Sequence, residues 1–77
     1  MLNRAQSRAA RALLEWSQAD LAARSNLSKS TVRDFEIGRR QPAINNLAAM
    51  RRALEEAGIE LFNDNAPGAR LHQRSAA

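Results

Sequence analysis

Cysteine is missing from this 77-residue chain, and histidine occurs once, as His72. Disulfides and thiolate metal sites therefore cannot stabilise the fold, and a single histidine cannot form a metal site alone. No apolar run approaches the ~20 residues that span a membrane, and the N-terminal stretch has no apolar segment of a secretory signal. These absences predict a small cytoplasmic domain without membrane contact. A chain of this size buries a modest core, so we expect oligomerisation to stabilise it.

Patterns typical of enzymes are missing as well. The sequence has no P-loop, no metal-ligand spacing and no nucleophilic triad. Glu55 and Glu56 could act as general acids, but nothing near them resembles a nucleophile or an oxyanion site. We therefore predict no enzymatic activity, no cofactor and no bound metal.

Positive charge is present in excess. The formal net charge is +4, and ten of the twelve Lys and Arg residues lie at or before Arg52, together with only four of the eight acids. Eleven of the twelve are arginines, whose planar side chain suits bidentate contacts to phosphate and guanine. The basic first two-thirds of the chain predicts a polyanionic partner.

Capping residues mark the first two expected helices. Asn3 can cap a first helix, with Gln6 three residues on completing a capping box, and this helix is expected to end around Trp16. Ser17 is a good N-cap for a second helix, expected over residues 18–25.

A short turn separates the second helix from the third. Asn26 tolerates the left-handed conformation that ends a helix, and Ser28 can cap a helix over residues 29–37 that buries Val32 and Phe35. The gap is too short for a loose linker. The sequence therefore predicts a helix-turn-helix corner.

A fourth helix and a hairpin are expected after the loop that follows. Asn45 can cap the fourth helix, which should run to about Ala57. Strand-forming residues at 59–62 and 69–73 flank a turn-rich segment and indicate a β-hairpin. The apolar residues of the fourth helix, spaced three and four apart, form one stripe: Leu47, Met50 and Leu54.

The chain is accordingly divided into a helix-turn-helix domain over 1–58 and a tail over 59–77. A lone hairpin is marginally stable, so it must pack on the helices or pair with another chain, which makes it a candidate dimerisation element. The alternative is a partly disordered tail, and residues 74–77 are expected to be frayed.

The third helix carries the residues with the clearest chemistry. In a DNA-reading helix-turn-helix, the second helix of the pair lies in the major groove with its first residues at base edges. Lys29 and Arg33, four apart, share a face and suit guanine, while Asp34 can accept from cytosine or hold either cation in place. The residues predicted to read bases are Ser28, Lys29, Ser30, Arg33 and Asp34, and those predicted to contact phosphate are Gln18, Thr31, Arg39 and Arg40.

The stretch SQADLAARSNLSKSTVRDFEIGRRQP, residues 17–42, resembles the phage-repressor and Cro-like (XRE) helix-turn-helix family. The matching features are Gln18-Ala19-x-Leu21-Ala22, the apolar-Ser turn, Thr31-Val32 and Phe35-Glu36-x-Gly38-x-x-x-Pro42. The resemblance covers roughly residues 4–57. It implies a mainly α, four-helix repressor-like fold and a sequence-specific DNA-binding transcriptional regulator, usually a homodimer on a near-palindromic site of double-stranded DNA. It also implies an ion pair between Arg11 and Glu36 inside the domain.

Two other functions stay open beside this reading. The chain could be an antitoxin that binds a toxin and represses its own operon. It could also be a protein-interaction module, such as an antiactivator of another regulator, on a scaffold that has lost DNA binding. In each case we expect a cytoplasmic protein of a bacterium or phage, associated with the nucleoid if it binds DNA.

Overall fold

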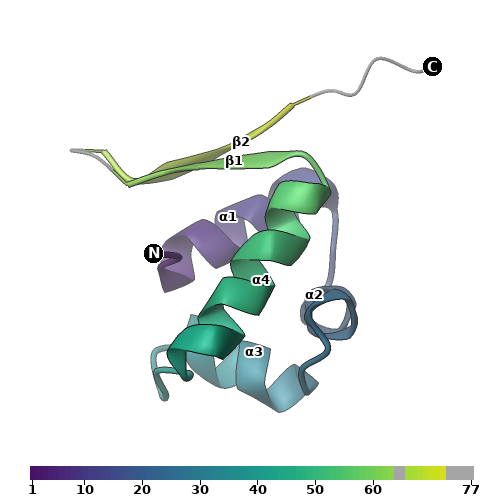
Figure 1. Ribbon diagram of the computed structural model, residues 1–77, viewed down its shortest axis with the longest axis vertical. Helices are drawn as coiled ribbons and strands as arrows, with labels where there is room; N and C mark the ends of the chain where they lie inside the picture. The colour runs from purple at the N-terminus through teal and green to yellow at the C-terminus, as the bar shows by residue number, and fades with distance from the viewer. Residues whose placement is uncertain (64–65, 73–77) are drawn as a thin grey trace.

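Four helices and a two-stranded hairpin follow one another in the computed structural model, which describes residues 1–63 and 66–72 (Figure 1). This confirms the predicted fold, mainly α with four helices and a C-terminal β-hairpin. The frayed end predicted for residues 74–77 lies outside the described residues. The elements are α1 (Arg4–Leu14), α2 (Gln18–Ser25), α3 (Lys29–Glu36), α4 (Ile44–Glu56), β1 (Ile59–Phe62) and β2 (Gly68–Leu71).

Side-chain caps start the first three helices at the predicted residues. The Asn3 side chain accepts from the Gln6 amide at 2.7 Å, and Gln6 Oε1 accepts from the Asn3 amide at 3.0 Å. Ser17 and Asp20 form a second reciprocal pair at the start of α2. Ser28 accepts from the backbone of α3. These bonds satisfy amides that a helix start otherwise leaves without partners.

The first helix ends slightly earlier than predicted, at Leu14 rather than around Trp16. Glu15 adopts a left-handed conformation with φ 57°, and the Trp16 amide donates to the Arg11 carbonyl at 2.8 Å. Bonds of this kind close a helix end and redirect the chain. The chain therefore turns at once towards α2.

The start of α4 corrects one prediction. The N-cap is Ala43, which has no side-chain cap, and Asn45 lies inside the first turn, so the predicted cap at Asn45 is wrong. The Ala43 carbonyl accepts from the Asn46 and Leu47 amides, each at 3.0 Å. The helix therefore starts with backbone bonds from Ala43 in place of a side-chain cap.

The hydrophobic core is formed by one face of each helix together with the first strand. The stripe predicted for α4 is buried, as are Val32 and Phe35 of α3. Alternate residues of β1 point into the same core. The buried apolar residues are Leu2, Ala10, Leu21, Ala22, Val32, Phe35, Leu47, Met50, Ala53, Leu54, Ile59 and Leu61.

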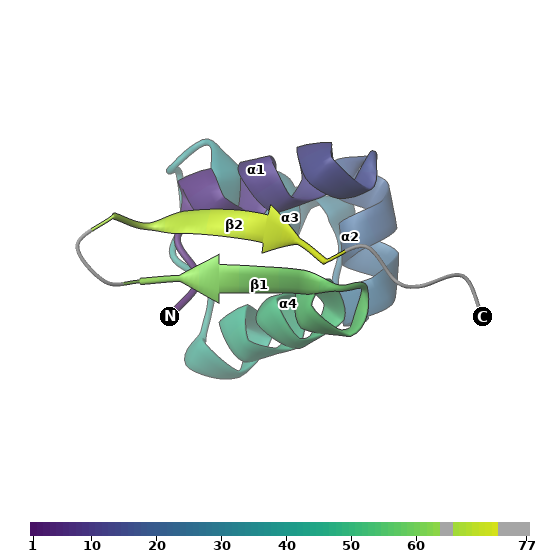
Figure 2. The same ribbon diagram turned by 90° about the horizontal axis from the view of Figure 1, so that it is seen from above.

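The hairpin packs on the helices, with β2 over α1 and β1 over α4 (Figure 2). The strands are antiparallel, and their register pairs Ile59 with Leu71 and Phe62 with Gly68. The first strand matches the prediction, while the second begins at Gly68 instead of residue 69 and ends at Leu71. Figure 1 shows the hairpin on the side of the molecule opposite α3.

A buried glutamine of α1 fastens the hairpin. Gln6 is 2% exposed, and its Nε2 donates to the Phe62 carbonyl at 2.6 Å and to the Gly68 carbonyl at 3.2 Å. These two carbonyls belong to different strands, so one amide group holds both strands where they approach the turn. The same side chain closes the N-terminal cap of α1 through Asn3.

Candidate nucleic-acid interface

The corner between α2 and α3 has the geometry that the short gap predicted. Asn26 adopts the left-handed conformation with φ 58°, and the Leu27 amide donates to the Ala22 carbonyl at 2.9 Å. Leu27 packs against the core. The turn is thus fastened by backbone bonds and by an apolar side chain, and α3 starts immediately after it.

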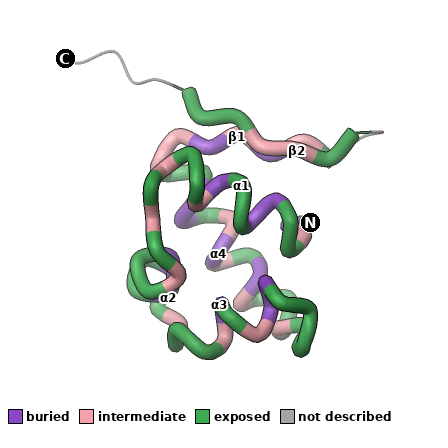
Figure 3. Tube along the Cα trace, turned by 180° about the vertical axis from the view of Figure 1, so that it is seen from behind, coloured by how far each residue is buried: buried purple, intermediate pink, exposed green. Residues whose placement is uncertain are grey.

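One face of α3 is buried and the other is exposed (Figure 3). Val32 and Phe35 are held in the core together with Glu36. Lys29 and Arg33 lie on the exposed face, and the Arg33 side chain is 51% exposed. Two cations are therefore presented to solvent from a helix whose opposite face is fixed by packing.

Hydroxyl groups cluster at the first turn of α3. Ser28 Oγ accepts from the Thr31 amide at 3.2 Å and lies 2.8 Å from Thr31 Oγ1 and 3.1 Å from Ser30 Oγ. Ser28 is already occupied as the helix cap, which limits what it can offer to a base. Ser30 is exposed, and it is the hydroxyl of this cluster best placed for an external partner.

Asp34 lies nearer the following loop than the two cations do. Its side chain is 17% exposed, and Oδ1 lies 3.4 Å from Arg33 Nε. Its carbonyl accepts from the Arg39 amide at 2.8 Å and from the Arg40 amide at 3.2 Å. Of the two roles weighed for this carboxylate, the geometry favours the one in which it holds Arg33 in place.

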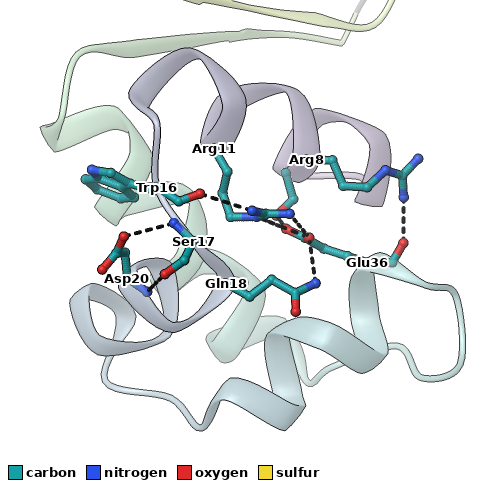
Figure 4. Close-up of polar contacts among 8 residues, drawn as sticks. Arg8, Arg11, Trp16, Ser17, Gln18, Asp20 and Glu36 are labelled. Carbon is teal, nitrogen blue, oxygen red and sulfur yellow. Dashed lines mark hydrogen bonds and ion pairs between the residues drawn. The ribbon is translucent and has the colours of Figure 1, made fainter.

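A buried carboxylate links α3 to α1 and α2 (Figure 4). Glu36 is 1% exposed, and its Oε1 lies 2.6 Å from Arg11 Nη2, which forms the ion pair that the family resemblance implied. Ser7 also donates to this carboxylate, and Arg11 Nη1 donates to the Trp16 carbonyl at 3.1 Å. Three segments of the chain are thereby joined behind the exposed face of α3.

The network sets the protonation state of Glu36. Burial alone would raise the pKa of this carboxyl group, but hydrogen bonds from Arg11, Ser7 and Gln18 together hold the pKa below its ordinary value. Glu36 is therefore ionised at neutral pH. A buried charge that is fully hydrogen-bonded stabilises the fold only while its partners remain in place.

Gln18 connects this network to the surface. Its Nε2 donates to Glu36 Oε1 at 3.2 Å, and the residue is partly exposed at the start of α2. One N–H of an amide group satisfies Glu36, which leaves a second N–H for an acceptor outside the protein. Glu36 thus orients the side chain that the sequence assigned to phosphate.

Two arginines of α1 that sequence reasoning missed support the loop after α3. Arg8 Nη1 donates to the Glu36 carbonyl at the end of α3, where a cation is favoured by the helix dipole. The Arg4 guanidinium lies over Gly38, and a Cβ at that glycine would fall 1.6 Å from Arg4 Nη1. Gly38 has φ 82°, a backbone conformation that favours glycine, whereas the Arg4 side chain could move aside for a larger residue. The signal available in the sequence was the spacing of these two arginines, four residues apart on one helix face.

The loop between α3 and α4 forms one wall of an electropositive hollow. Arg39 and Arg40 are exposed and, with Arg4, line a hollow of about 490 Å³ that also contacts Phe35. Three arginines line this hollow, and the guanidinium group of arginine suits anions. The two loop arginines and Gln18 lie on segments that flank α3.

The fold and this surface together define a helix-turn-helix domain, with a second helix that is exposed on one face and flanked by cationic side chains. A protein-family model described as Helix-turn-helix matches residues 8–61. The chain belongs to this family and is of the XRE type, which confirms the resemblance seen in the sequence. A search among curated proteins gives no match.

Membership establishes the general activity. The protein is a DNA-binding helix-turn-helix regulator of transcription, and its family is one of DNA-binding regulators, not of enzymes. Among residues 1–63 and 66–72, no helix is both long and apolar enough to cross a membrane.

Proposed function

We propose that this protein is a sequence-specific transcriptional repressor that reads the major groove with α3 and binds a near-palindromic operator as a homodimer. The observation that carries the proposal is the way α3 packs on the domain. Its inner face is buried through Val32, Phe35 and Glu36, while Lys29 and Arg33 stay exposed. A helix held rigid in this way can place a few exposed polar side chains at the edges of the bases.

The site residues divide by their expected targets. Lys29 and Arg33 suit guanine O6 and N7, while serine hydroxyls can donate to or accept from several bases. Contacts to phosphate would set the register of the helix on the duplex but carry no sequence information. We propose base reading for Lys29, Ser30 and Arg33, with Asp34 orienting Arg33 and Ser28 contributing from its place as the helix cap. We propose phosphate contact for Gln18, Thr31, Arg39 and Arg40.

A homodimer would place two α3 helices in successive major grooves, ~34–36 Å apart. Such a dimer would occlude a promoter, and repression follows from that occlusion without any activating surface. We place the protein in the cytoplasm of a bacterium or of a phage-infected cell, where its DNA target lies. We also propose residues 1–58 as the part of the chain that contacts DNA, because the hairpin that follows packs on the side opposite α3.

Selection of bound duplexes from a random DNA pool at physiological salt tests this function. Sequencing should show an enriched two-fold-symmetric motif whose half-sites lie one helical turn apart. An enriched motif without two-fold symmetry would support sequence-specific binding and contradict the homodimer.

Absence of any enrichment, with folding verified by circular dichroism, would contradict sequence-specific DNA reading. The antitoxin and antiactivator interpretations would then take its place, with a toxin or another regulator as the partner. A protein partner would be recognised by binding that hardly responds to salt, because no condensed counterions are released from DNA.

A further inference from the structure

Three arginines around the electropositive hollow have no anionic partner in the described part of the chain. Arg4, Arg39 and Arg40 line the hollow, and none of their side chains forms an ion pair or a hydrogen bond with a described residue. Met1 also lines it, and its amino group is a further positive charge. No Asp or Glu is among the described residues that line the hollow. Its cations therefore lie around one space without an acid to neutralise them.

The acids of the neighbouring segments are engaged elsewhere. Residues 1–14, which end with α1, contain no Asp or Glu, and neither does the loop over residues 37–43. On α3, Glu36 is buried in an ion pair within the domain, and the Asp34 carboxylate lies 3.4 Å from Arg33 Nε. An anion from outside the chain is therefore attracted to the hollow.

Apolar side chains also line the hollow. Leu2 and Phe35 belong to the core, whereas Met1 is 64% exposed. A methionine side chain is flexible and adapts to irregular partners. The hollow measures about 490 Å³, which falls within the ~300–1,000 Å³ of small-molecule sites. The hollow therefore suits a small organic anion whose body lies against apolar groups.

We propose that the electropositive hollow binds a small phosphate ester, a free molecule whose phosphate is held by the three arginines and whose organic part lies on the apolar lining. A phosphate monoester carries about −1.5 to −2 charge at neutral pH and three acceptor oxygens, which match several guanidinium donors better than a single carboxylate does. Arg4 belongs to the start of α1, and Arg39 and Arg40 belong to the loop after α3, on the same side of the molecule (Figure 1). A bound ester would join these two segments.

The bound ester would compete with DNA, and this part of the proposal rests on the proposed function. Arg39 and Arg40 are the loop arginines proposed for DNA phosphate, and a guanidinium group that holds the ester is no longer free for the duplex. The ester would therefore lower the affinity for the operator, and by linkage the duplex would lower the affinity for the ester by the same factor. The protein would thus release its DNA when the ester accumulates.

Titration calorimetry with phenyl phosphate tests the hollow without DNA. At constant ionic strength, the natural protein should bind this ester with a dissociation constant of roughly 0.1–1 mM. Arg4→Gln should weaken binding about tenfold or more, because it removes a hydrogen bond from a charged donor. Arg52→Gln makes the same change at an exposed arginine of α4 that does not line the hollow, and it should bind like the natural protein. No binding by the natural protein, or equal losses in the two variants, would overturn the proposal.

Inorganic phosphate measures what the apolar lining contributes. It has the same anionic group as phenyl phosphate but no organic part, and the two are compared at a pH where both are doubly charged. Inorganic phosphate should bind about threefold more weakly or worse, because it buries no apolar surface. Equal affinities would show that the anion alone is bound and would reject the ester.

Nuclear magnetic resonance locates the ester on the natural protein, so it decides if Arg4→Gln proves unfolded by circular dichroism. Phenyl phosphate should shift the amide signals of the lining residues Asn3, Gly38 and Gln41. The amides of α2, none of whose residues lines the hollow, should keep their positions. Shifts that are absent from the lining residues, or equally large in α2, would contradict the site.

Operator binding in the presence of phenyl phosphate separates this proposal from the proposed function. At constant ionic strength, saturating ester should weaken binding by the natural protein about fivefold or more and change binding by Arg4→Gln much less. Unchanged operator affinity would overturn the competition, and a salt slope lowered by ~1 in Arg4→Gln would assign the hollow to a DNA phosphate instead. If the natural protein binds no selected duplex, the proposed DNA reading fails, while the titrations without DNA still decide the hollow.

Discussion

Lys29 and Arg33 are the two side chains that should report sequence reading most directly. Both lie on the exposed face of α3, and neither contributes to the core. Lys29→Ala and Arg33→Ala should each weaken operator binding by ~1–3 kcal/mol and relax the preference at one base pair. Binding to a set of operator variants measures both effects.

Arg70→Ala is a matched control for this prediction. It removes the same charge from the hairpin, which lies opposite α3 (Figure 1). Binding by Arg70→Ala should keep the natural preference at every position. Preserved base preference in Lys29→Ala would show that Lys29 does not read bases.

The unfolding free energy of the protein should depend on pH through Glu36. The pKa of Glu36 is lowered in the folded protein, so its contribution to stability is present above its unfolded pKa. That contribution is lost as the pH falls below about 4.5, the ordinary value for the group, and through the folded pKa. Glu36→Gln should lower the unfolding free energy at neutral pH by ~3 kcal/mol, because Arg11 is left half-buried without its counter-charge.

Urea unfolding at a series of pH values checks this dependence. The unfolding free energy of the natural protein should decline more steeply on acidification than that of Glu36→Gln. The pKa of Asp20 is also lowered, by hydrogen bonds from the Ser17 backbone and side chain. Because Asp20 is exposed, Asp20→Asn compares the loss of an exposed carboxylate with the loss of the buried one. Identical slopes for Glu36→Gln and the natural protein would mean that the ionised carboxylate does not support the fold.

At the scale of elements, the contact between α1 and the hairpin depends on Gln6. Gln6→Ala would leave the Phe62 and Gly68 carbonyls without their side-chain donor. We expect a loss of ~1–3 kcal/mol, as for polar groups left unsatisfied in a protein interior. In Gln6→Ala, the hairpin amides should exchange faster than they do in the natural protein. The α3 amides should change less, since the bonds from Gln6 go to the hairpin and not to α3.

Asn3→Ala is the comparison for Gln6→Ala. It removes one half of the α1 capping box and leaves the two bonds from Gln6 to the hairpin. It should cost ~1 kcal/mol with little change in hairpin exchange. Equal hairpin exchange in the two variants would show that Gln6 acts as a helix cap and not as an anchor of the strands.

Elements also show how far the sequence determines the structure. The first three helices begin at Asn3, Ser17 and Ser28 because each cap lies within three residues of the amide it satisfies, and such local chemistry can be read from sequence. The start of α4 was mispredicted at Asn45 because its N-cap, Ala43, has no polar side chain that would mark the boundary in the sequence.

The candidate site divides in the same way. The exposed face of α3 follows from helical spacing, so Lys29 and Arg33 could be placed from sequence. The support that Arg8 gives to the Glu36 carbonyl joins residues 28 positions apart, so the spacing of Arg4 and Arg8 shows that they share a helix face but not which segment they contact. The bond from Gln18 to Glu36 is similarly distant. Such contacts need the tertiary arrangement of three helices before they can be seen.

At the scale of the whole molecule, charge should govern affinity for any DNA. Arg39→Ala removes an exposed loop cation beside the electropositive hollow. Binding to specific and unrelated duplexes should weaken alike, and the slope of log affinity against log salt should fall by ~1. Titrations at several salt concentrations measure the slope, and Arg70→Ala again provides the distant control. A loss confined to the operator would assign Arg39 to base reading instead.

The contact between Gln6 and the hairpin has a consequence for how the protein is made. The two carbonyls that Gln6 binds lie 56 and 62 residues further along the chain. During translation, the Gln6 side chain therefore lacks these two partners until residues 62 and 68 have left the ribosome. A product that terminates before the hairpin would carry a polar amide in an apolar setting and lack part of its core. We expect such fragments to be degraded, so that only full-length copies compete for the operator.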